Sequence, residues 1–187
     1  MKIYTKKGDK GQTTLFSGEK ADKDDQRIEA NGTLDEVNST IGLLRVKSGQ
    51  DHNWQEGLHQ IQVEVMQLMS FIASPGKEIN IDPINKGIKK IEEWIDEICA
   101  KTDKMNALIL PGGNEISALC HIIRTQVRRA ERKVFKLHKT QPVEEACLSY
   151  LNRLSDLFFM LAQLEMQESD IPVEKFKYPG PDKEKNE

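Results

Sequence analysis

ALCHIIRTQVRRAERK, residues Ala118–Lys133, carries the clearest helical pattern in this chain of 187 residues. Apolar side chains recur every three or four positions in and around it, which predicts an α-helix with one face in a core. Arg124, Arg128 and Arg132 are spaced four apart and form a second row beside that apolar face. The apolar positions are Ile116, Leu119, Ile123, Val127, Ala130, Val134 and Leu137.

The arginine row has two interpretations. Guanidinium groups are planar, permanently charged and suited to bidentate binding of phosphate or carboxylate, so the row is typical of an anion site, such as one for a polyphosphate. Glu131 falls close to Arg124 and Arg128 on the helical wheel and would orient one of them. The alternative is an ordinary amphipathic helix whose basic flank pairs with acidic residues on its neighbours.

Further amphipathic segments surround this helix. Asp82 and Pro83 are typical of a helix N-cap followed by proline in the first turn. No strand is expected beyond a short stub at 108–110. We therefore predict an all-α, up-and-down bundle of five helices. The other predicted helices cover about 25–48, 53–74, the segment beginning at Asp82, and 143–168, and the arginine helix ends near His138.

The predicted domain organisation is simple. One domain covers 1–172, with a non-helical arm at 1–24 and the helix bundle at 25–168. Residues 173–187 are rich in charge and proline, and we expect a disordered tail.

Composition narrows the class of protein. The net charge is −3 and aromatic residues make up 6%, which disfavours a nucleic-acid-binding protein. No apolar run is long enough for a membrane span, and the N-terminus lacks the apolar core of a signal peptide. Cys99, Cys120 and Cys147 fall in apolar helical patterns, so we expect reduced, buried thiols in a cytoplasmic protein.

The N-terminal arm has the residues of a phosphate-binding loop. Its segment Thr5–Thr14 contains two glycines, three lysines and three threonines. Gly8 and Gly11 allow backbone N–H groups to approach a ligand closely, and lysine and hydroxyl groups complement phosphate. The Walker A pattern is absent. A polar arm without a ligand is the alternative.

Three kinds of chemistry suit a helix bundle. A di-iron centre needs two Glu-x-x-His motifs, but the chain has one such spacing, Glu56 to His59. Cys120 and His121 are neighbours that point about 100° apart on a helix, so they make a poor catalytic dyad. His121 is better explained as a polar edge residue or an anion contact. A nucleotide polyphosphate site that uses the arm and the arginine row together is favoured.

Five motifs in one order are similar to the PduO-type ATP:cob(I)alamin adenosyltransferases. The similarity runs from about residue 3 to residue 168. The resemblance implies a homotrimer of five-helix bundles with active sites at the subunit interfaces. It also implies transfer of the 5′-deoxyadenosyl group of ATP to the cobalt of a reduced corrinoid. The motifs are TKKGDKGQTT from Thr5, KDDQRIEANGTLDEVNS from Lys23, ILPGG from Ile109, RTQVRRAER from Arg124 and YLNRLSD from Tyr150.

The resemblance also assigns site residues. It pairs Asp35 with Arg124 of a neighbouring subunit, and it makes these two residues, Arg128 and Arg132 the catalytic group. Leu108 occupies a place where many family members have phenylalanine, and it would form a wall of the corrinoid pocket. The ATP-binding residues would be Thr5, Lys6, Lys7, Gly8, Asp9, Gly11, Thr13, Thr14, Lys23, Arg128, Arg129, Glu131, Arg132 and Asn152.

The same resemblance implies partners. ATP is the co-substrate, cobalamin the acceptor, and Mg²⁺ binds mainly through the ATP phosphates rather than to the protein. A reductase or a cobalamin-dependent acceptor enzyme is a possible partner, and no nucleic acid or membrane is implied. The face of the first helix that carries Asp35, Asn38, Ser39 and Gly42 would meet another subunit. The rival hypothesis is a scaffolding bundle whose arginine row docks acidic partners.

Overall fold

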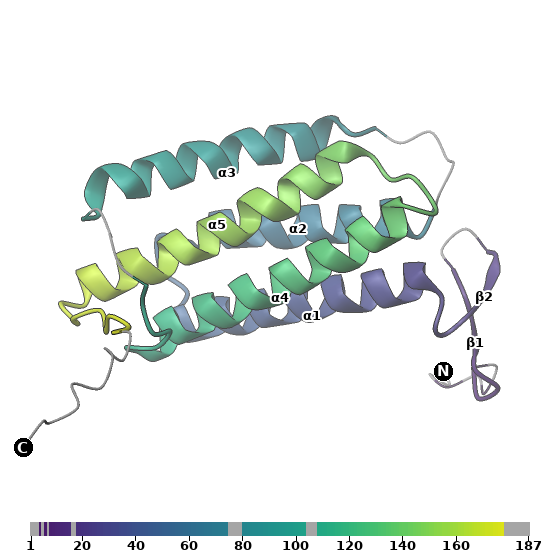
Figure 1. The fold of residues 1–187 in the computed structure, drawn as a ribbon, viewed down its shortest axis with the longest axis horizontal. Coiled ribbons are helices and arrows are strands. Elements are labelled where there is room, and N and C mark those ends of the chain that lie inside the picture. Colours follow the sequence, from purple (N-terminus) through teal and green to yellow (C-terminus); the bar gives the residue numbers. More distant parts are fainter. Residues whose placement is uncertain are drawn as a thin grey trace, which may run out of the picture.

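Five long helices lie side by side in the computed structural model (Figure 1). The structure describes residues 4, 6, 8–15, 18–74, 80–103 and 108–177. The predicted five-helix bundle is confirmed, and the predicted boundaries lie within a few residues of the observed ones. The helices are α1 (Gln26–Ser48), α2 (Gln55–Ile72), α3 (Asp82–Lys101), α4 (Glu115–His138) and α5 (Glu145–Glu168).

The core lies where α4 packs between α1 and α5, while α3 packs on α5 and α2 on α1. The apolar stripe of α4 faces this core, as predicted: Ile123, Val127 and Val134 are fully buried. Burying one such side chain stabilises the fold by about 1.5–3 kcal/mol relative to exposure. One face of α4 is thus committed to packing, which leaves the neighbouring arginine row at the surface.

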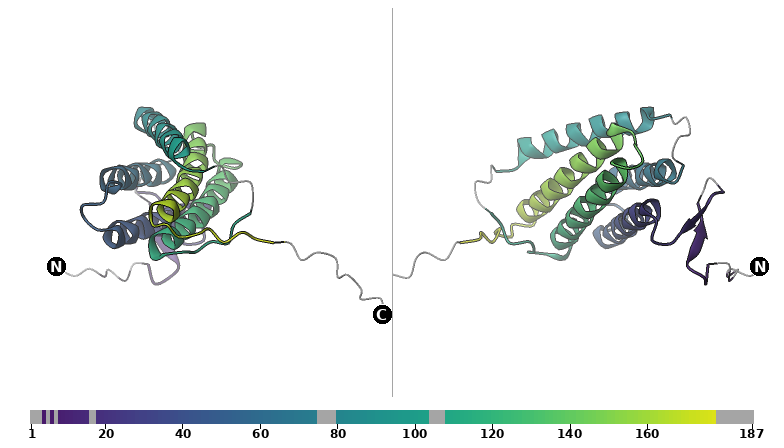
Figure 2. Two further views of the ribbon diagram at one scale, coloured as in Figure 1. Left: turned by 90° about the vertical axis from the view of Figure 1, so that its left-hand side faces the viewer. Right: turned by 45° about the vertical axis from the view of Figure 1, so that its right-hand side comes forward.

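The N-terminal arm contains a small hairpin that the sequence analysis did not predict. Strand β1 (Gln12–Thr14) pairs antiparallel with β2 (Lys20–Asp22), and the hairpin lies beyond the N-terminus of α1 (Figures 1 and 2). Leu15 N–H donates to the Glu19 carbonyl at 2.8 Å, and Leu15 and Ala21 are buried. Strands of three mostly polar residues show no alternation of hydrophobicity, so their pairing left no pattern to detect.

A strap of residues 172–177 lies at the opposite end of the bundle, where α4 begins (Figure 1). Ile109 forms an antiparallel bridge with Lys175, Leu110 N–H donates to the Glu174 carbonyl, and Phe176 N–H donates to the Leu108 carbonyl, both at 2.8 Å. The stub predicted at 108–110 is confirmed. The disordered tail predicted from residue 173 is wrong for 173–177, because backbone pairing does not require apolar side chains; residues 178–187 lie outside the described part.

Two local expectations are corrected. Asp82 is the first helical residue of α3 rather than its cap, and its N–H donates to Asn80 Oδ1 at 3.1 Å. Cys120 and Cys147 are buried as expected, whereas Cys99 is exposed. None of the five described helices combines the length and apolar character that crossing a lipid bilayer requires.

Candidate functional site

The basic residues of α4 divide into a paired flank and an unpaired row. On the side facing α1, Lys133 Nζ lies 2.7 Å from Glu29 Oε1, and Arg129 forms an ion pair with Glu36. The hydrogen bond from Lys133 lowers the pKa of Glu29. On this flank the basic side chains of α4 are neutralised by carboxylates of α1, as in an ordinary amphipathic helix. Arg129 belongs to this paired flank and not to the row of Arg124, Arg128 and Arg132.

The row itself is not neutralised within the described residues: Arg124, Arg128 and Arg132 have no ion pair there. Arg128 and Arg132 are exposed, and Arg124 is half-buried with its Nε lacking a hydrogen-bond partner. Burial and the charge of Arg128 lower the pKa of Arg124. An anion bound along the row would stabilise all three charges, so the structure favours the anion-site interpretation here.

A hollow of about 460 Å³ between α4 and α5 adjoins the end of this row and is lined in part by Glu131, Arg132 and Asn152. Asn152 Nδ2 donates to Glu131 Oε1 at 3.3 Å, and Arg153 Nη1 donates to Asn152 Oδ1 at 2.8 Å. The structure thus brings together three of the residues assigned by resemblance. We had expected Glu131 to lie against Arg124 or Arg128. In the structure its carboxylate instead accepts a hydrogen bond from Asn152.

The glycine turn of the arm lies against Lys23. Gly11 N–H donates to the Gly8 carbonyl at 3.2 Å, and Lys23 N–H donates to the Gly11 carbonyl at 2.8 Å. Gly11 has a φ of +82°, which favours glycine. Lys23 Nζ lies 3.4 Å from the place a Cβ at Gly8 would take. The turn and its lysine are therefore close together. Thr5 and Lys7 lie outside the described residues.

The other arm residues surround this turn. Lys6, Asp9 and Thr14 are exposed, and Thr13 is half-buried. Their polar groups are available to a ligand, as the resemblance to a phosphate-binding arm implies.

Arg27, in the first turn of α1, is a structural residue that was not predicted from the sequence. Its side chain is buried and donates to Glu19 Oε2 at 2.9 Å and to Asp25 Oδ2 at 2.8 Å. Asp25 also caps α1 by accepting from Arg27 N–H at 2.8 Å. The hydrogen bond from Arg27 lowers the pKa of Asp25. One guanidinium thus ties the hairpin to α1. An arginine just inside a helix start, within an acidic run, was the available signal.

The second face of α1 is only partly free. Gln62 of α2 covers it at Asn38 and Gly42: its Nε2 donates to the Asn38 carbonyl at 3.0 Å and lies 3.3 Å from the place of a Cβ on Gly42. At these two residues, part of the face that was expected to meet another subunit is thus covered by α2 of the same chain.

Asp35 and Ser39, on the same face, remain exposed. No ion pair joins Asp35 to Arg124 within the described part of the chain. The pairing of these two side chains inside one chain is thus not observed.

Leu108 presents an exposed side chain, with 61% of its surface accessible, and Leu110, two residues further on, is 43% exposed. Their backbones are held by the strap, so an apolar edge faces outward at a fixed place. Nearby, His121 is buried with an edge-on contact to Phe159 at 6.2 Å between ring centroids. The expectation of a polar edge residue at His121 is wrong, because the start of α4 is covered by α5.

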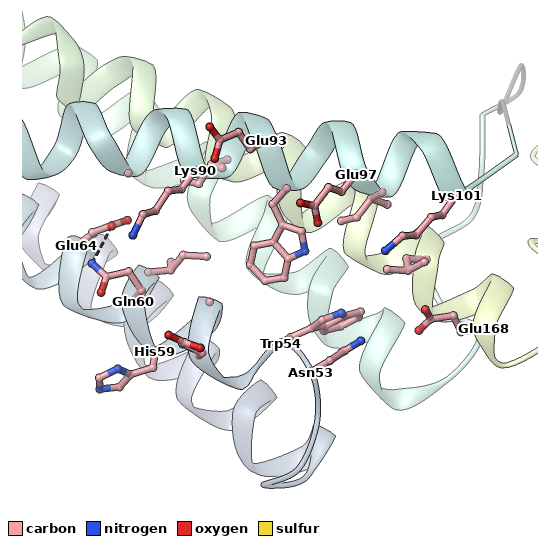
Figure 3. Close-up of a pocket in the computed structure, with 18 residues that line it drawn as sticks. Asn53, Trp54, His59, Gln60, Glu64, Lys90, Glu93, Glu97, Lys101 and Glu168 are labelled. Carbon is pink, nitrogen blue, oxygen red and sulfur yellow. Dashed lines mark hydrogen bonds between the residues drawn. The ribbon is translucent and has the colours of Figure 1, made fainter.

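A hollow of about 660 Å³ lies between α2 and α3 (Figure 3). Its walls include Trp54, Lys90 and the buried Glu64, which accepts from Tyr150 Oη at 2.7 Å. No residue assigned to the site lines it. The two helices touch little, and that separation accounts for its size. Glu56 and His59 lie on its rim, but the described residues contain no group of three side chains suited to a metal.

Comparison with known proteins agrees with this geometry. Residues 3–165 match the family model for cobalamin adenosyltransferase. The chain is 41% identical over 179 residues to a corrinoid adenosyltransferase of Bacillus subtilis (strain 168), covering 91% of this chain and 90% of that protein. It is 39% identical over 169 residues to corrinoid adenosyltransferase MMAB of Homo sapiens, covering 87% and 68%.

Among solved structures, a variant PduO-type ATP:corrinoid adenosyltransferase from Lactobacillus reuteri, complexed with cobalamin and ATP, superposes with a TM-score of 0.88. The two sequences are 29% identical, and the match covers 95% of this chain and 100% of that one. The family match, the relatives and the fold agree over almost the whole described bundle. This chain belongs to the cobalamin adenosyltransferase family.

Proposed function

We propose that this protein transfers the 5′-deoxyadenosyl group of ATP to the cobalt of cob(I)alamin or a related reduced corrinoid and releases triphosphate. The observation that carries the proposal is the row of Arg124, Arg128 and Arg132, which has no ion pair within the described residues and lies beside the hollow lined by Glu131 and Asn152. Family membership favours this enzyme over a scaffolding bundle, which would need no such hollow.

The triphosphate is proposed to bind between the arm and the row. The turn from Gly8 to Gly11 lies close to Lys23, which adds a cation beside the proposed triphosphate. Arg128 and Arg132 supply guanidinium groups that match phosphate geometry. Lys6, Thr13 and Thr14 add donors along the arm.

We propose that two subunits share this site. Within one chain, no hydrogen bond or ion pair links the described arm residues to the arginine row. The exposed Asp35 also has no partner there, although it is the residue expected to join Arg124 of a neighbour. A cyclic homotrimer, in which the arm of one subunit meets α4 of the next, would complete each site.

The chemistry requires no protein nucleophile. Cob(I)alamin itself attacks the 5′-carbon of ATP: the Co–C bond forms as the C–O bond to the triphosphate breaks. Arg128 and Arg132 stabilise the charge that develops on the leaving triphosphate, and the arm holds the nucleotide in line with cobalt. The exposed apolar edge at Leu108 is proposed as a wall for the corrinoid.

Mg²⁺ is proposed to bind as a complex with ATP, mainly through its phosphates. In phosphate-transfer sites this ion usually binds substrate phosphates and one or two carboxylates, and keeps several waters. The exposed Asp9, between Gly8 and Gly11, is suited to supply one such oxygen. A cytoplasmic location and an interaction with a reductase or an acceptor enzyme stay predictions.

An anaerobic assay tests the function. Cobalamin is reduced chemically to the Co(I) state, ATP and Mg²⁺ are added, and absorbance follows formation of the Co–C bond. We expect turnover that depends on both ATP and protein, with one triphosphate released per Co–C bond. Saturable binding of ATP without any adenosylation of the corrinoid would contradict the proposal.

A further inference from the structure

A small cavity lies under the loop that follows Leu108, at the strap end of the bundle. Its volume is about 110 Å³, and its walls come from the segment Ile109–Gly113, from α4, from α5 and from the strap. Ser117 and His121 line it from α4, and Gln163 lines it from α5. It is separate from the hollow at Asn152.

Three polar atoms of residues that line this cavity lack hydrogen-bond partners among the described residues. They are Nδ1 of His121 and both amide atoms of Gln163, whose residues are only 5% and 6% exposed. Ser117 does not satisfy them, because its hydroxyl donates to the Ala162 carbonyl at 3.2 Å. Buried polar groups nearly always have hydrogen-bond partners, so we expect a polar ligand in this cavity to supply them.

The cavity is lined from α4, the same helix that carries the proposed triphosphate contacts. His121 precedes Arg124 by one turn and Arg128 by two, which places it about 10 Å along the helix axis from the proposed triphosphate contacts. Ile109 in its wall adjoins the exposed Leu108, the proposed corrinoid wall. The strap end and the arm end of α4 would therefore serve the two substrates separately (Figure 1).

We propose that His121 and Gln163 bind a primary carboxamide on the rim of the corrinoid and so select amidated corrinoids over those with a free carboxylate. The inference rests on the proposed adenosyl transfer. A glutamine amide offers one donor and one acceptor, which is the complement of another primary amide. Neutral imidazole can accept the second amide hydrogen at Nδ1, and burial together with Arg124 lowers the pKa of His121, which favours the neutral form.

A carboxylate would meet a different environment. It has no hydrogen to give to Gln163 Oε1 or His121 Nδ1, so two acceptors would stay unpaired beside it. The charge of Arg124, one turn away, acts in the opposite direction and favours a carboxylate. Comparing the two ligand types therefore tests whether the amide contacts or the arginine charge decides selectivity.

The probes are cobalamin and its monocarboxylic acids, in each of which one side-chain amide has been hydrolysed. All are reduced to Co(I), and kcat/KM is measured with saturating ATP. We expect the unmodified protein to use one isomer about tenfold to a hundredfold less well than cobalamin, the usual effect of losing a buried hydrogen-bonding group. Gln163→Met should use that isomer and cobalamin equally well.

Controls separate the possible results. Gln50→Met, at an exposed position between α1 and α2, should keep the full discrimination. His121→Leu should abolish the discrimination between cobalamin and the acid, as Gln163→Met should. This second variant provides the test if Gln163→Met fails to fold. Equal use of every isomer by the unmodified protein would show that the cavity holds water only and would overturn the inference. No turnover of cobalamin itself would instead contradict the proposed function.

Discussion

At the scale of single residues, we propose that the unpaired basic side chains of α4 bind the ligand and that the paired ones stabilise the fold. Arg128 is exposed and unpaired in the described structure, whereas Lys133 is paired with Glu29. We predict that Arg128→Ala lowers turnover by about two to three orders of magnitude, as expected for losing one preorganised charge stabiliser. Lys133→Ala is the matched control, and it should lose much less.

Steady-state kinetics at saturating ATP measure this difference, and circular dichroism checks that helix content is unchanged, since alanine is a good helix former. Near-normal turnover of Arg128→Ala would contradict the assignment of this residue to the proposed site.

His121 should make the stability of the folded protein depend on pH. Its pKa is lowered in the folded protein, first by burial and then by Arg124, so the unfolded state binds the proton more readily. Its contribution to stability is thus present above the unfolded pKa and is lost as pH falls toward the folded pKa. We predict that the free energy of unfolding decreases between about pH 7 and pH 5, by at most about 1.4 kcal/mol per pH unit from this group.

Urea unfolding at several pH values measures this dependence. His121→Asn should flatten it, whereas His59→Asn, at an exposed position on α2, should not. The same slope in the native protein and in His121→Asn would show that other groups cause it.

At the scale of secondary-structure elements, Arg27 joins the arm to α1. Arg27→Lys keeps the charge but loses the forked contacts to Glu19 and Asp25, which an ammonium group cannot reproduce. We predict that KM for ATP rises about tenfold or more while kcat changes less, because the arm is positioned less often.

Limited proteolysis of the arm, with and without ATP, gives an independent measurement. If Arg27→Lys cuts kcat and leaves KM unchanged, then Arg27 does not act through the arm.

The packing of α3 provides a prediction about stability. A Cβ added at Gly87 would lie 2.7 Å from Glu64 Oε2, and that carboxylate is held by the buried Tyr150. Gly87→Ala should destabilise the fold by about 1–3 kcal/mol, the usual range for overpacking. Gly32→Ala, on the exposed side of α1 with nothing within 4 Å, should instead stabilise it by up to about 1 kcal/mol. Thermal unfolding distinguishes the two, and equal shifts would contradict the packing argument.

At the scale of the whole molecule, we propose a shared site because no hydrogen bond or ion pair joins the arm to the arginine row within the described residues of one chain. Lys23→Ala and Arg128→Ala proteins should each be nearly inactive. Unfolded and reassembled together in equal amounts, they should recover about a quarter of native activity, because random mixing gives that fraction of interfaces with both elements intact.

A mass tag on one variant confirms that mixed oligomers form. If mixed oligomers are present and activity stays at the level of the single variants, both elements belong to one chain's site and the shared-site proposal fails.

The sequence alone determined the five helices, since the spacing of apolar residues follows directly from helix geometry. It also determined the family, because motifs such as the arm and the arginine segment are contiguous stretches that can be read directly from the sequence. The hairpin and the strap were not predictable in this way, since backbone pairing between distant segments leaves little trace in side-chain pattern.

Only the tertiary structure decided which polar side chains are partnered. Arg129 and Arg128 are adjacent in sequence and chemically identical, yet only Arg129 meets a carboxylate, Glu36 of α1. Gln163 and His121 lie on different helices, and packing alone buries them around one cavity. The physical reason is that periodicity states which face of a helix is apolar, whereas the neighbours of its polar groups depend on how separate helices pack against one another.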